Sequence, residues 1–351
     1  MLEKKVDDLL QKYAKKTKTL QFAMHLPSRN LRYRFSSTMP EQRFHSASVG
    51  KLMTATVIFA AIEQGKLSLE SRICTLLEPE ILDRLFVFQG HDYQEEITVK
   101  QLLNHTSGVN DYFESKTMDG SLFVDAVIQH PDTMWMPKDL LDFTRDRQQA
   151  VAKPGEMFFY SDTGFILLGL IAEAVFAMPF HQVLKTVLFD PANMHDTDLC
   201  FYGDGFDPAA LAPLFINNVD VHLFRSLSCD FSGGGLSTTA DDLLKFLDYL
   251  QSGACISRQS IDIMSGFEHR FRQGLYYAAG MMQIRFEEFF FLLKGMPRLQ
   301  GHVGVTGVHA WYDPETQDSF ALNVGNASDM ALSFQLLITI IQLIRRENGK
   351  K

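Results

Sequence analysis

The first pattern of apolar positions along the chain has the period of a helix. Five apolar residues share one face, with lysine and aspartate between them: Leu2, Val6, Leu9, Leu10 and Tyr13. This spacing predicts an amphipathic surface helix. Two short apolar runs follow at residues 20–26 and 31–35, and the turn residues between them predict a hairpin that begins a sheet.

The next pattern is different, because residues 48–64 are apolar on nearly all sides before the run stops at Gly65. A helix of this kind belongs in the centre of a molecule, with the glycine as its C-cap. From about residue 70 to 250 the pattern is mostly helical with long connections. The last third changes to short β-rich runs separated by turn residues, at 278–286, 289–295, 303–314 and 319–326.

This order of elements predicts the fold class. Strands at both ends of the chain with helices between them imply a sheet that both ends complete. We therefore expect an α/β (α+β) fold, an antiparallel sheet flanked by helices with a mostly helical domain inserted. Residues 1–70 and 250–351 would form the sheet domain, and residues 71–249 the helical domain.

The composition of the chain limits the kinds of partner that we expect it to bind. The chain has 351 residues, 46% of them hydrophobic, and its net charge of -9 is spread along the sequence. No cluster of lysine and arginine with interleaved aromatic residues is present, so nucleic acid is not an expected partner. The four cysteines lie far apart without a CxxC motif, and the eleven histidines show no ligand spacing. We therefore expect free thiols, no metal site and no cofactor.

Targeting signals are also weak. The first sixteen residues lack the apolar core of a signal peptide, which predicts a cytoplasmic protein, although a chain trimmed of its export signal would look the same. Residues 331–346 form an apolar run that is interrupted by serine, threonine and glutamine, and it is shorter than the ~20 residues that a membrane span needs. We predict a helix packed on the sheet and no membrane span.

Candidate chemistry begins at the head of the buried helix, where Ser48 and Lys51 stand three residues apart. Residues with this spacing share a helix face, so the hydroxyl and the amine can meet. A buried lysine shifted toward its neutral form can take the proton of a serine, and the helix N-terminus supplies N–H groups for an oxyanion. The alternative is a chance S-x-x-K sequence in which Ser48 is only an N-cap.

Two later segments complete a pattern. They are Tyr-Ser-Asp at residues 160–162, on a turn that leads into a helix, and His-Val-Gly at residues 302–304, at the start of a glycine-rich strand. With S-x-x-K, the set resembles the three motifs of penicillin-binding proteins and serine β-lactamases. The resemblance is strongest to the class C β-lactamase branch, which also holds esterases and D-amino-acid peptidases, and it spans roughly residues 20 to 345.

The resemblance implies acyl transfer in a cleft between the two domains. Ser48 would attack a carbonyl while Lys51 helps to remove its proton, and Tyr160 would serve as second base and then as acid to the leaving group. The backbone N–H groups of Ser48 and Val305 would bind the oxyanion. As an alternative, Tyr160 is simply a packed aromatic residue.

Asp162 departs from the family pattern, which usually has asparagine at this position. A carboxylate can only accept hydrogen bonds, and it favours the charged form of Lys51. Proton transfer would then lean more on Tyr160, and binding of a peptide-like amide would weaken. A tolerated variant with water filling in is an equal alternative.

His302 stands where the family has the lysine of K-T-G, so a fixed positive charge is lost. Together with Val303 in place of threonine, this favours esters or small amides without a carboxylate over β-lactams. A protonated His302 beside Asp162 could still bind an anion. Gly304 is expected at the substrate, or only in tight strand packing. Tyr112 is expected in the acyl pocket, or as an ordinary surface tyrosine.

These observations predict a serine hydrolase that works through an acyl-serine intermediate. The expected partner is a small-molecule ester, amide or peptide-like substrate, and the oligomeric state stays open. The first hypothesis is an esterase or amidase, with a D,D-peptidase or weak β-lactamase as the alternative enzyme. A binding or sensing protein without turnover is the alternative of another class.

Overall fold

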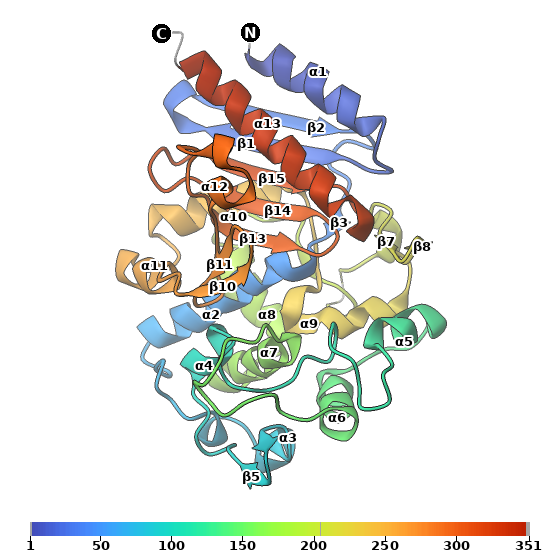
Figure 1. The fold of residues 1–351 in the computed structure, drawn as a ribbon, viewed down its shortest axis with the longest axis vertical. Helices are drawn as coiled ribbons and strands as arrows, with labels where there is room; N and C mark the ends of the chain where they lie inside the picture. The colour runs from blue at the N-terminus through green and yellow to red at the C-terminus, as the bar shows by residue number, and fades with distance from the viewer. Residues whose placement is uncertain (1, 204, 349–351) are drawn as a thin grey trace.

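A large antiparallel sheet forms the centre of the computed structural model, which describes residues 2–203 and 205–348 (Figure 1). The eight strands run in the order β10-β11-β12-β13-β14-β15-β1-β2. The N-terminal region supplies the hairpin of β1 (Gln21–Leu26) and β2 (Leu31–Ser36), as predicted. The C-terminal region supplies β10 (His269–Arg272), β11 (Leu275–Tyr277), β12 (Met282–Ile284), β13 (Gln300–Gly304), β14 (Val308–Tyr312) and β15 (Ser319–Asn323). The predicted fold class is confirmed.

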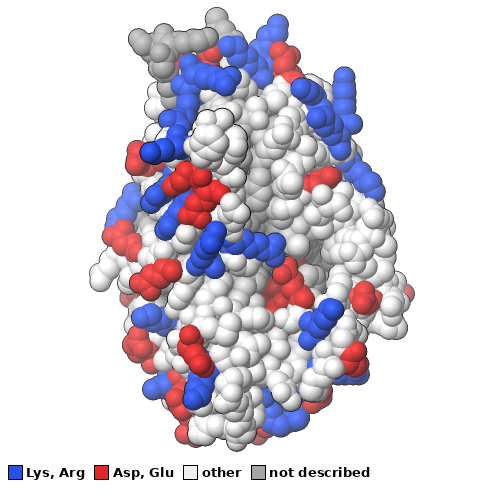
Figure 2. Space-filling model, viewed as in Figure 1, with Lys and Arg blue, Asp and Glu red and all other residues white. Residues whose placement is uncertain are grey.

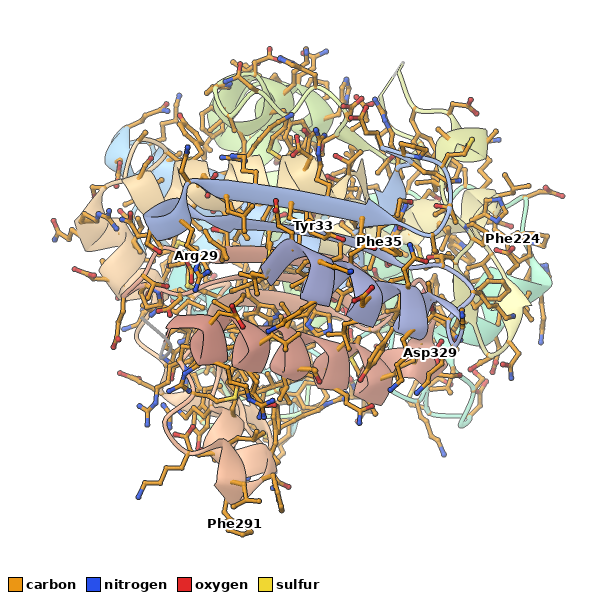
Figure 3. All side chains as sticks on the ribbon, turned by 90° about the horizontal axis from the view of Figure 1, so that it is seen from above. Arg29, Tyr33, Phe35, Phe224, Phe291 and Asp329 are labelled. Atoms are coloured by element: carbon orange, nitrogen blue, oxygen red, sulfur yellow. The ribbon has the colours of Figure 1, made fainter. Side chains whose placement is uncertain are left out.

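The two terminal helices cover one face of this sheet, where α1 (Leu2–Ala14) and α13 (Met330–Asn348) lie side by side (Figure 3). Figure 3 also shows Tyr33 and Phe35 of β2 near α1. The apolar faces of α1 and α13 pack in one hydrophobic cluster with residues of the sheet, which confirms that both helices are amphipathic. By length and composition, the helical stretch Ala327–Glu347 could cross a membrane, but it buries one face against this sheet.

Helices on the opposite face form the larger core. The central helix α2 (Gly50–Glu63) is buried on nearly every side, which explains why its sequence shows no polar face. It packs against α7 (Asp162–Phe176) and α9 (Phe231–Gly234). Gly65 has a φ of +68°, a conformation that suits the glycine predicted to end this helix.

Helices joined by long connections are the main regular elements in the middle of the chain, as its pattern predicted. Its helices are α3 (Pro79–Leu82), α4 (Val99–Leu103), α5 (Phe123–Gln129), α6 (Pro137–Arg147), α8 (Phe180–Leu184), α10 (Ala240–Ser252) and α11 (Arg258–Met264). A small sheet joins β3 (Phe44–His45), β9 (Leu236–Thr238) and β6 (Asp198–Leu199). Two short hairpins pair β4 (Val87–Phe88) with β5 (His91–Asp92) and β7 (Phe215–Ile216) with β8 (Val219–Asp220). The division into domains stays a prediction.

One strand prediction is wrong, because residues 289–295 do not join the sheet. The short helix α12 (Phe286–Phe289) and a 3-10 turn at Phe291–Leu293 occupy this region. The segment has consecutive apolar residues without the alternation of a half-buried strand. Phe289 packs its ring against Phe334 of α13, with centroids 5.5 Å apart, while Phe291 projects outward (Figure 3).

Candidate active site

The candidate nucleophile lies on a tight turn just before α2. Ser48 belongs to a 3-10 turn, Ala47–Val49, and Ala47 has a φ of +45°, which residues other than glycine rarely adopt. Two buried hydrogen bonds hold the turn. The Ala47 N–H donates to Nδ1 of His45 over 3.1 Å, and the Ser46 hydroxyl donates to the Gly234 carbonyl over 2.7 Å. Such overdetermined strain is typical of functional turns.

Two glycines let the surrounding backbone close on this turn. A Cβ atom at Gly234, where φ is +151°, would lie 2.2 Å from the Ala47 carbonyl oxygen. At Gly304 it would lie 2.7 Å from Cβ of Ala47 and 3.2 Å from the Ser48 nitrogen. Gly304 also lines the large cavity next to Ser48. Both alternatives for Gly304, a place at the cavity and tight strand packing, therefore describe its position.

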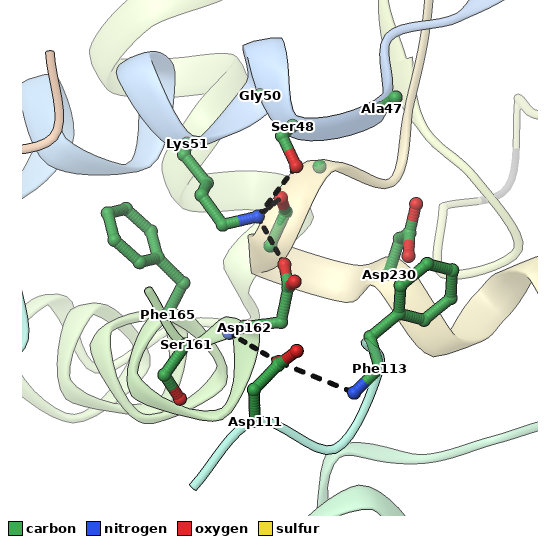
Figure 4. Close-up of polar contacts among 12 residues, drawn as sticks. Ala47, Ser48, Gly50, Lys51, Asp111, Phe113, Ser161, Asp162, Phe165 and Asp230 are labelled. Carbon is green, nitrogen blue, oxygen red and sulfur yellow. Dashed lines mark hydrogen bonds and ion pairs between the residues drawn. The ribbon is translucent and has the colours of Figure 1, made fainter. Parts of the chain in front are cut away.

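Lys51 is fully buried beneath Ser48, and its ammonium group has three acceptors (Figure 4). Nζ donates to the Ser48 hydroxyl over 3.0 Å, to the Gly233 carbonyl over 2.6 Å and to the Asp162 carboxylate. Three acceptors match the three protons of an ammonium group, so this geometry stabilises the charged form of Lys51. The structure brings together Ser48, Lys51 and Asp162, and Asp162 favours that form as the sequence suggested.

Asp162 begins α7, and its place depends on a second aspartate. The Asp162 N–H donates to Oδ1 of Asp111 over 2.9 Å, and Asp111 also accepts from the backbone of Phe113 and Glu114 (Figure 4). Burial and the negative charge of Asp162 raise the pKa of the Asp111 carboxyl to about 7. Asp111 thus fixes the start of α7.

Tyr160 lies beside the lysine, with its ring centroid 5.2 Å from Nζ of Lys51, and it lines the large cavity with Ser48. Burial and then the charge of Asp162 raise the pKa of the phenol well above its ordinary value, while a hydrogen bond with Ser48 partly opposes the shift. The phenol is therefore protonated at rest. This favours Tyr160 as a proton donor, whereas the family resemblance implied a second base first and a proton donor afterwards.

His105 positions Tyr160 by accepting hydrogen bonds from the two residues that flank it in the sequence. Its carbonyl accepts from the Phe159 N–H over 2.8 Å, and its Nδ1 accepts from the Ser161 N–H over 3.1 Å. The rings of His105 and Tyr160 lie 4.4 Å apart. Burial and the charge of Lys51 lower the pKa of His105, which keeps the imidazole neutral and Nδ1 free to accept. His105 is a positioning residue.

The structure does not bring His302 to the cavity. The side chain is fully buried on the inner face of β13, with Nδ1–H donating to the Val303 carbonyl over 2.9 Å and Nε2 3.4 Å from the Tyr277 hydroxyl. Burial and the charge of Lys51 lower its pKa to about 3. Both expectations for His302, direct substrate contact and a protonated anion site, are therefore wrong for this geometry.

Tyr112 is also placed differently from the prediction. Its side chain is fully buried, and its hydroxyl donates to the Cys229 carbonyl over 2.7 Å. Its backbone N–H donates to Oγ1 of Thr163 in α7. Tyr112 lines neither cavity at Ser48 and instead braces the start of α7, so both the acyl-pocket and the surface interpretations are corrected.

Two cavities meet at Ser48. The larger has a volume of about 690 Å³ and extends from Ser48 toward α13. The smaller is acidic, with Glu114, Asp162 and Asp230 in its lining. Val305, which is 38% exposed, lines both cavities, so its backbone lies near Ser48, and the oxyanion role of the two residues stays a prediction. Figure 2 shows a hollow near the middle of the face that carries α13, with charged side chains at its rim.

The Beta-lactamase family model matches residues 33–334, most of the chain. The chain belongs to the Beta-lactamase family. Among curated relatives, it is 29% identical over 212 residues to the probable fimbrial assembly protein FimD, serogroup H1, of Dichelobacter nodosus, covering 58% of this chain and 48% of that protein. It is 27% identical over 158 residues to Penicillin-binding protein 4 of Amycolatopsis lactamdurans, covering 44% and 35%. The chain thus spans half the length of these relatives or less.

Solved structures share the fold over nearly the whole chain. A D-amino acid amidase from Ochrobactrum anthropi SV3, complexed with L-phenylalanine amide, aligns with a TM-score of 0.82 over 99% of both chains at 21% identity. EstCE1, described as a hydrolase with promiscuous acyltransferase activity, aligns with a TM-score of 0.78 over 98% of both chains at 19% identity. At these identities the likeness establishes the fold alone.

Sequence reasoning missed several groups that this Beta-lactamase family member places around Lys51. The Gly233 carbonyl is invisible to motif analysis, because every residue carries a carbonyl. Asp230 lies in the smaller cavity, where burial and the charge of Asp162 raise its pKa to about 7. Asp111 directly precedes Tyr112 in the sequence. Only the folded chain shows that its carboxylate accepts from the backbone of Asp162 at the start of α7.

Proposed function

We propose that the protein is a serine hydrolase that cleaves an ester or amide bond through an acyl-serine intermediate. The observation that carries this proposal is the contact of the Ser48 hydroxyl with Lys51, itself held by Asp162, at the end of a cavity large enough for a substrate. Family membership supports the same chemistry.

The contacts define a proton path for acylation. Lys51 donates to Ser48 at rest, so it must first pass a proton to the Asp162 carboxylate before it can accept the proton of Ser48. The Ser48 oxygen then bonds to the substrate carbonyl carbon. Tyr160 donates its phenolic proton to the leaving group as the bond to that group breaks.

Deacylation returns each group to its starting state. The Tyr160 phenolate takes a proton from a water molecule, whose oxygen attacks the acyl carbon. The bond to the Ser48 oxygen breaks, and Lys51 gives its proton back to that oxygen. Asp162 then returns its proton to Lys51, so the net reaction consumes only water and substrate.

The surroundings of Ser48 favour substrates without a carboxylate. His302 is neutral and buried, and three carboxylates line the smaller cavity. Arg272 lines the larger cavity, but it pairs with Glu114, with Nη2 and Oε2 3.5 Å apart. An amide with a free amino group is a second candidate, because the carboxylates of the smaller cavity can accept hydrogen bonds from an ammonium group.

Turnover assays with Ser48→Ala test the proposal. The wild-type protein should hydrolyse p-nitrophenyl acetate or D-phenylalanine amide, and Ser48→Ala should lose at least about 10³-fold in kcat/KM while its unfolding midpoint is unchanged. Ser252→Ala, at the exposed end of α10, is the matched control and should be fully active.

Covalent labelling decides between the remaining alternatives. A fluorophosphonate probe should mark Ser48 in the wild-type protein. Faster turnover of nitrocefin than of either substrate would indicate a β-lactamase instead. Absence of both turnover and labelling would leave a binding protein without catalysis and would overturn the proposal.

A further inference from the structure

The larger cavity extends far beyond the space that the reacting bond needs. It begins at Ser48 and Tyr160 and continues between the strands β10–β13 and the N-terminal half of α13. Its lining is mostly apolar along this length, and the apolar side chains that line it include Leu275, Met282, Phe289, Val303, Phe334 and Ile338. A site of about 300–1,000 Å³ with few polar groups is typical of pockets for small lipophilic ligands.

Strands and helices carry most of the apolar residues of these walls. Side chains alternate along β13, so Val303 faces the cavity while its neighbour His302 is buried on the other face. Phe334 and Ile338 are four residues apart on α13 and therefore share one face of that helix. The Phe289 ring packs edge-on against Phe334 and closes the far side.

Few polar groups in the lining can bind a charged substrate group. The Arg272 guanidinium pairs with Glu114 and also lies 4.9 Å from the centroid of the Phe271 ring. Gln273, Gln335 and Thr339 are the other uncharged polar side chains along the walls, apart from the catalytic pair at the inner end. A charged substrate group placed against the apolar walls would lose water, and the two charged side chains of the lining, Arg272 and Glu114, already pair with each other.

We propose that this cavity binds an unbranched apolar chain of the substrate, so that the enzyme acts on medium-chain lipophilic esters or amides. The proposal rests on the proposed function. If a methylene group takes roughly 30 Å³, the share of one liquid water molecule, eight methylenes need roughly 240 Å³. The cavity, at about 690 Å³, holds such a chain with room to spare.

Two ester series test the proposal and distinguish the two ends of the substrate. In one, the acyl chain of p-nitrophenyl esters lengthens from acetate to decanoate; in the other, acetate esters carry alcohols from methanol to octanol. Each added methylene should raise kcat/KM by roughly two- to fourfold in the series whose chain enters the cavity. The other series should stay nearly flat.

A substitution at the cavity wall sharpens the test. Ile338→Trp narrows the cavity from the half-buried face of α13, and the ratio of octanoate to acetate kcat/KM should fall at least tenfold. Ile263→Trp is the matched control, because Ile263 is 43% exposed on α11 and lies outside the lining. This control should leave the ratio and both rates at wild-type values.

Labelling rates provide a readout that does not need turnover. An octyl fluorophosphonate should label Ser48 at least tenfold faster than a methyl fluorophosphonate, and Ile338→Trp should remove the difference. Turnover of acetate that depends on Ser48 but shows no gain with chain length in either series overturns this inference alone. Absence of all ester cleavage and all labelling overturns the proposed function and this inference with it.

Discussion

The two sides of Ser48 differ in nearly every physical respect. Behind the serine, Lys51, Asp162 and Asp111 form a buried polar network in which hydrogen bonds join Ser48 to Lys51, Lys51 to Asp162, and the backbone of Asp162 to Asp111. In front of it, the large cavity is mostly apolar, so shape and burial of apolar surface are what it offers a substrate. One side is suited to moving protons, and the other to selecting a substrate.

Different elements build the two sides. The network rests on α2 and α7, whose starts bring Lys51 and Asp162 together, whereas the cavity rests on β10–β13 and α13. The strand β13 separates them, since His302 lies on the buried face and Val303 on the cavity face. Substrate preference can therefore change through the cavity walls without altering the groups that carry protons.

Lys51→Met should produce the largest effect, because it removes the cation from the polar side. Asp162 would keep a buried carboxylate without its partner, and the loss of one member of a buried pair costs about 3–5 kcal/mol in the free energy of unfolding. Esterase activity should fall at least about 10³-fold, because no amine remains to take the proton of Ser48. Urea unfolding and steady-state kinetics measure the two effects.

Lys138→Met is the matched control for that change. Lys138 pairs with Asp142 on the surface of α6, and its side chain is 80% exposed. An exposed pair of this kind contributes about 0–1 kcal/mol, so stability and activity should stay close to wild type. Retention of more than a tenth of the activity by Lys51→Met would show that another group removes the proton of Ser48.

Gly304→Ala tests the boundary between the two sides, and we expect a smaller effect. The new methyl group would meet Cβ of Ala47 at 2.7 Å and the Ser46 carbonyl oxygen at 3.0 Å. Overpacking of this kind costs about 1–3 kcal/mol, and a displaced nucleophile should lower kcat/KM by roughly 10–100-fold. Kinetics with p-nitrophenyl acetate and thermal unfolding measure the change.

A second glycine provides the comparison for Gly304. At Gly266 the nearest atom to an added Cβ is the Ile263 carbonyl oxygen, at 3.5 Å, so Gly266→Ala meets no steric conflict. This variant should keep wild-type activity. Equal activities of the two variants would mean that the turn at Ser48 yields to the methyl group without losing its catalytic geometry.

The local part of this site could be predicted from the sequence. The contact of Ser48 with Lys51 follows from their i, i+3 spacing across the 3-10 turn and the first turn of α2, which places near neighbours in the sequence on one face. The strands at both ends of the chain followed from short apolar and β-rich runs bounded by turn residues, and α2 from a run with no polar face. Each of these features depends on neighbours in the sequence.

The predictions that were wrong concern residues whose positions depend on tertiary packing. The alternation of β13 shows that His302 and Val303 face opposite ways, but not which of them faces the cavity, and the resemblance favoured His302. Tyr112 is buried in the larger core, where its hydroxyl donates to the carbonyl of Cys229, more than a hundred residues later. The Gly233 carbonyl at Lys51 has no sequence signal at all. Secondary-structure propensities and sequence motifs contain no information about contacts between residues that are far apart in the sequence.

Asp230→Asn should have the smallest effect, confined to the dependence of stability on pH. Burial and the charge of Asp162 raise the pKa of Asp230 to about 7, while an unfolded aspartate loses its proton near pH 4. Between these values the unfolded chain has released a proton that the folded protein keeps. The free energy of unfolding therefore falls as pH rises through this window, by at most about 1.4 kcal/mol per pH unit, and levels off above pH 7.

In Asp230→Asn this loss of stability with rising pH should disappear, because the asparagine side chain does not titrate. Urea unfolding at pH 4.5, 6 and 7.5 should show a shallower fall for Asp230→Asn and a gain of about 1–2 kcal/mol over wild type at pH 7.5. His45, whose Nε2 lies 3.6 Å from Asp230, does not interfere, since burial lowers its pKa to about 4 and it is neutral through most of this window. If the free energies of unfolding of the two proteins changed in parallel with pH, the Asp230 charge would lie in solvent. That result would weaken the contrast between the buried network and the open cavity.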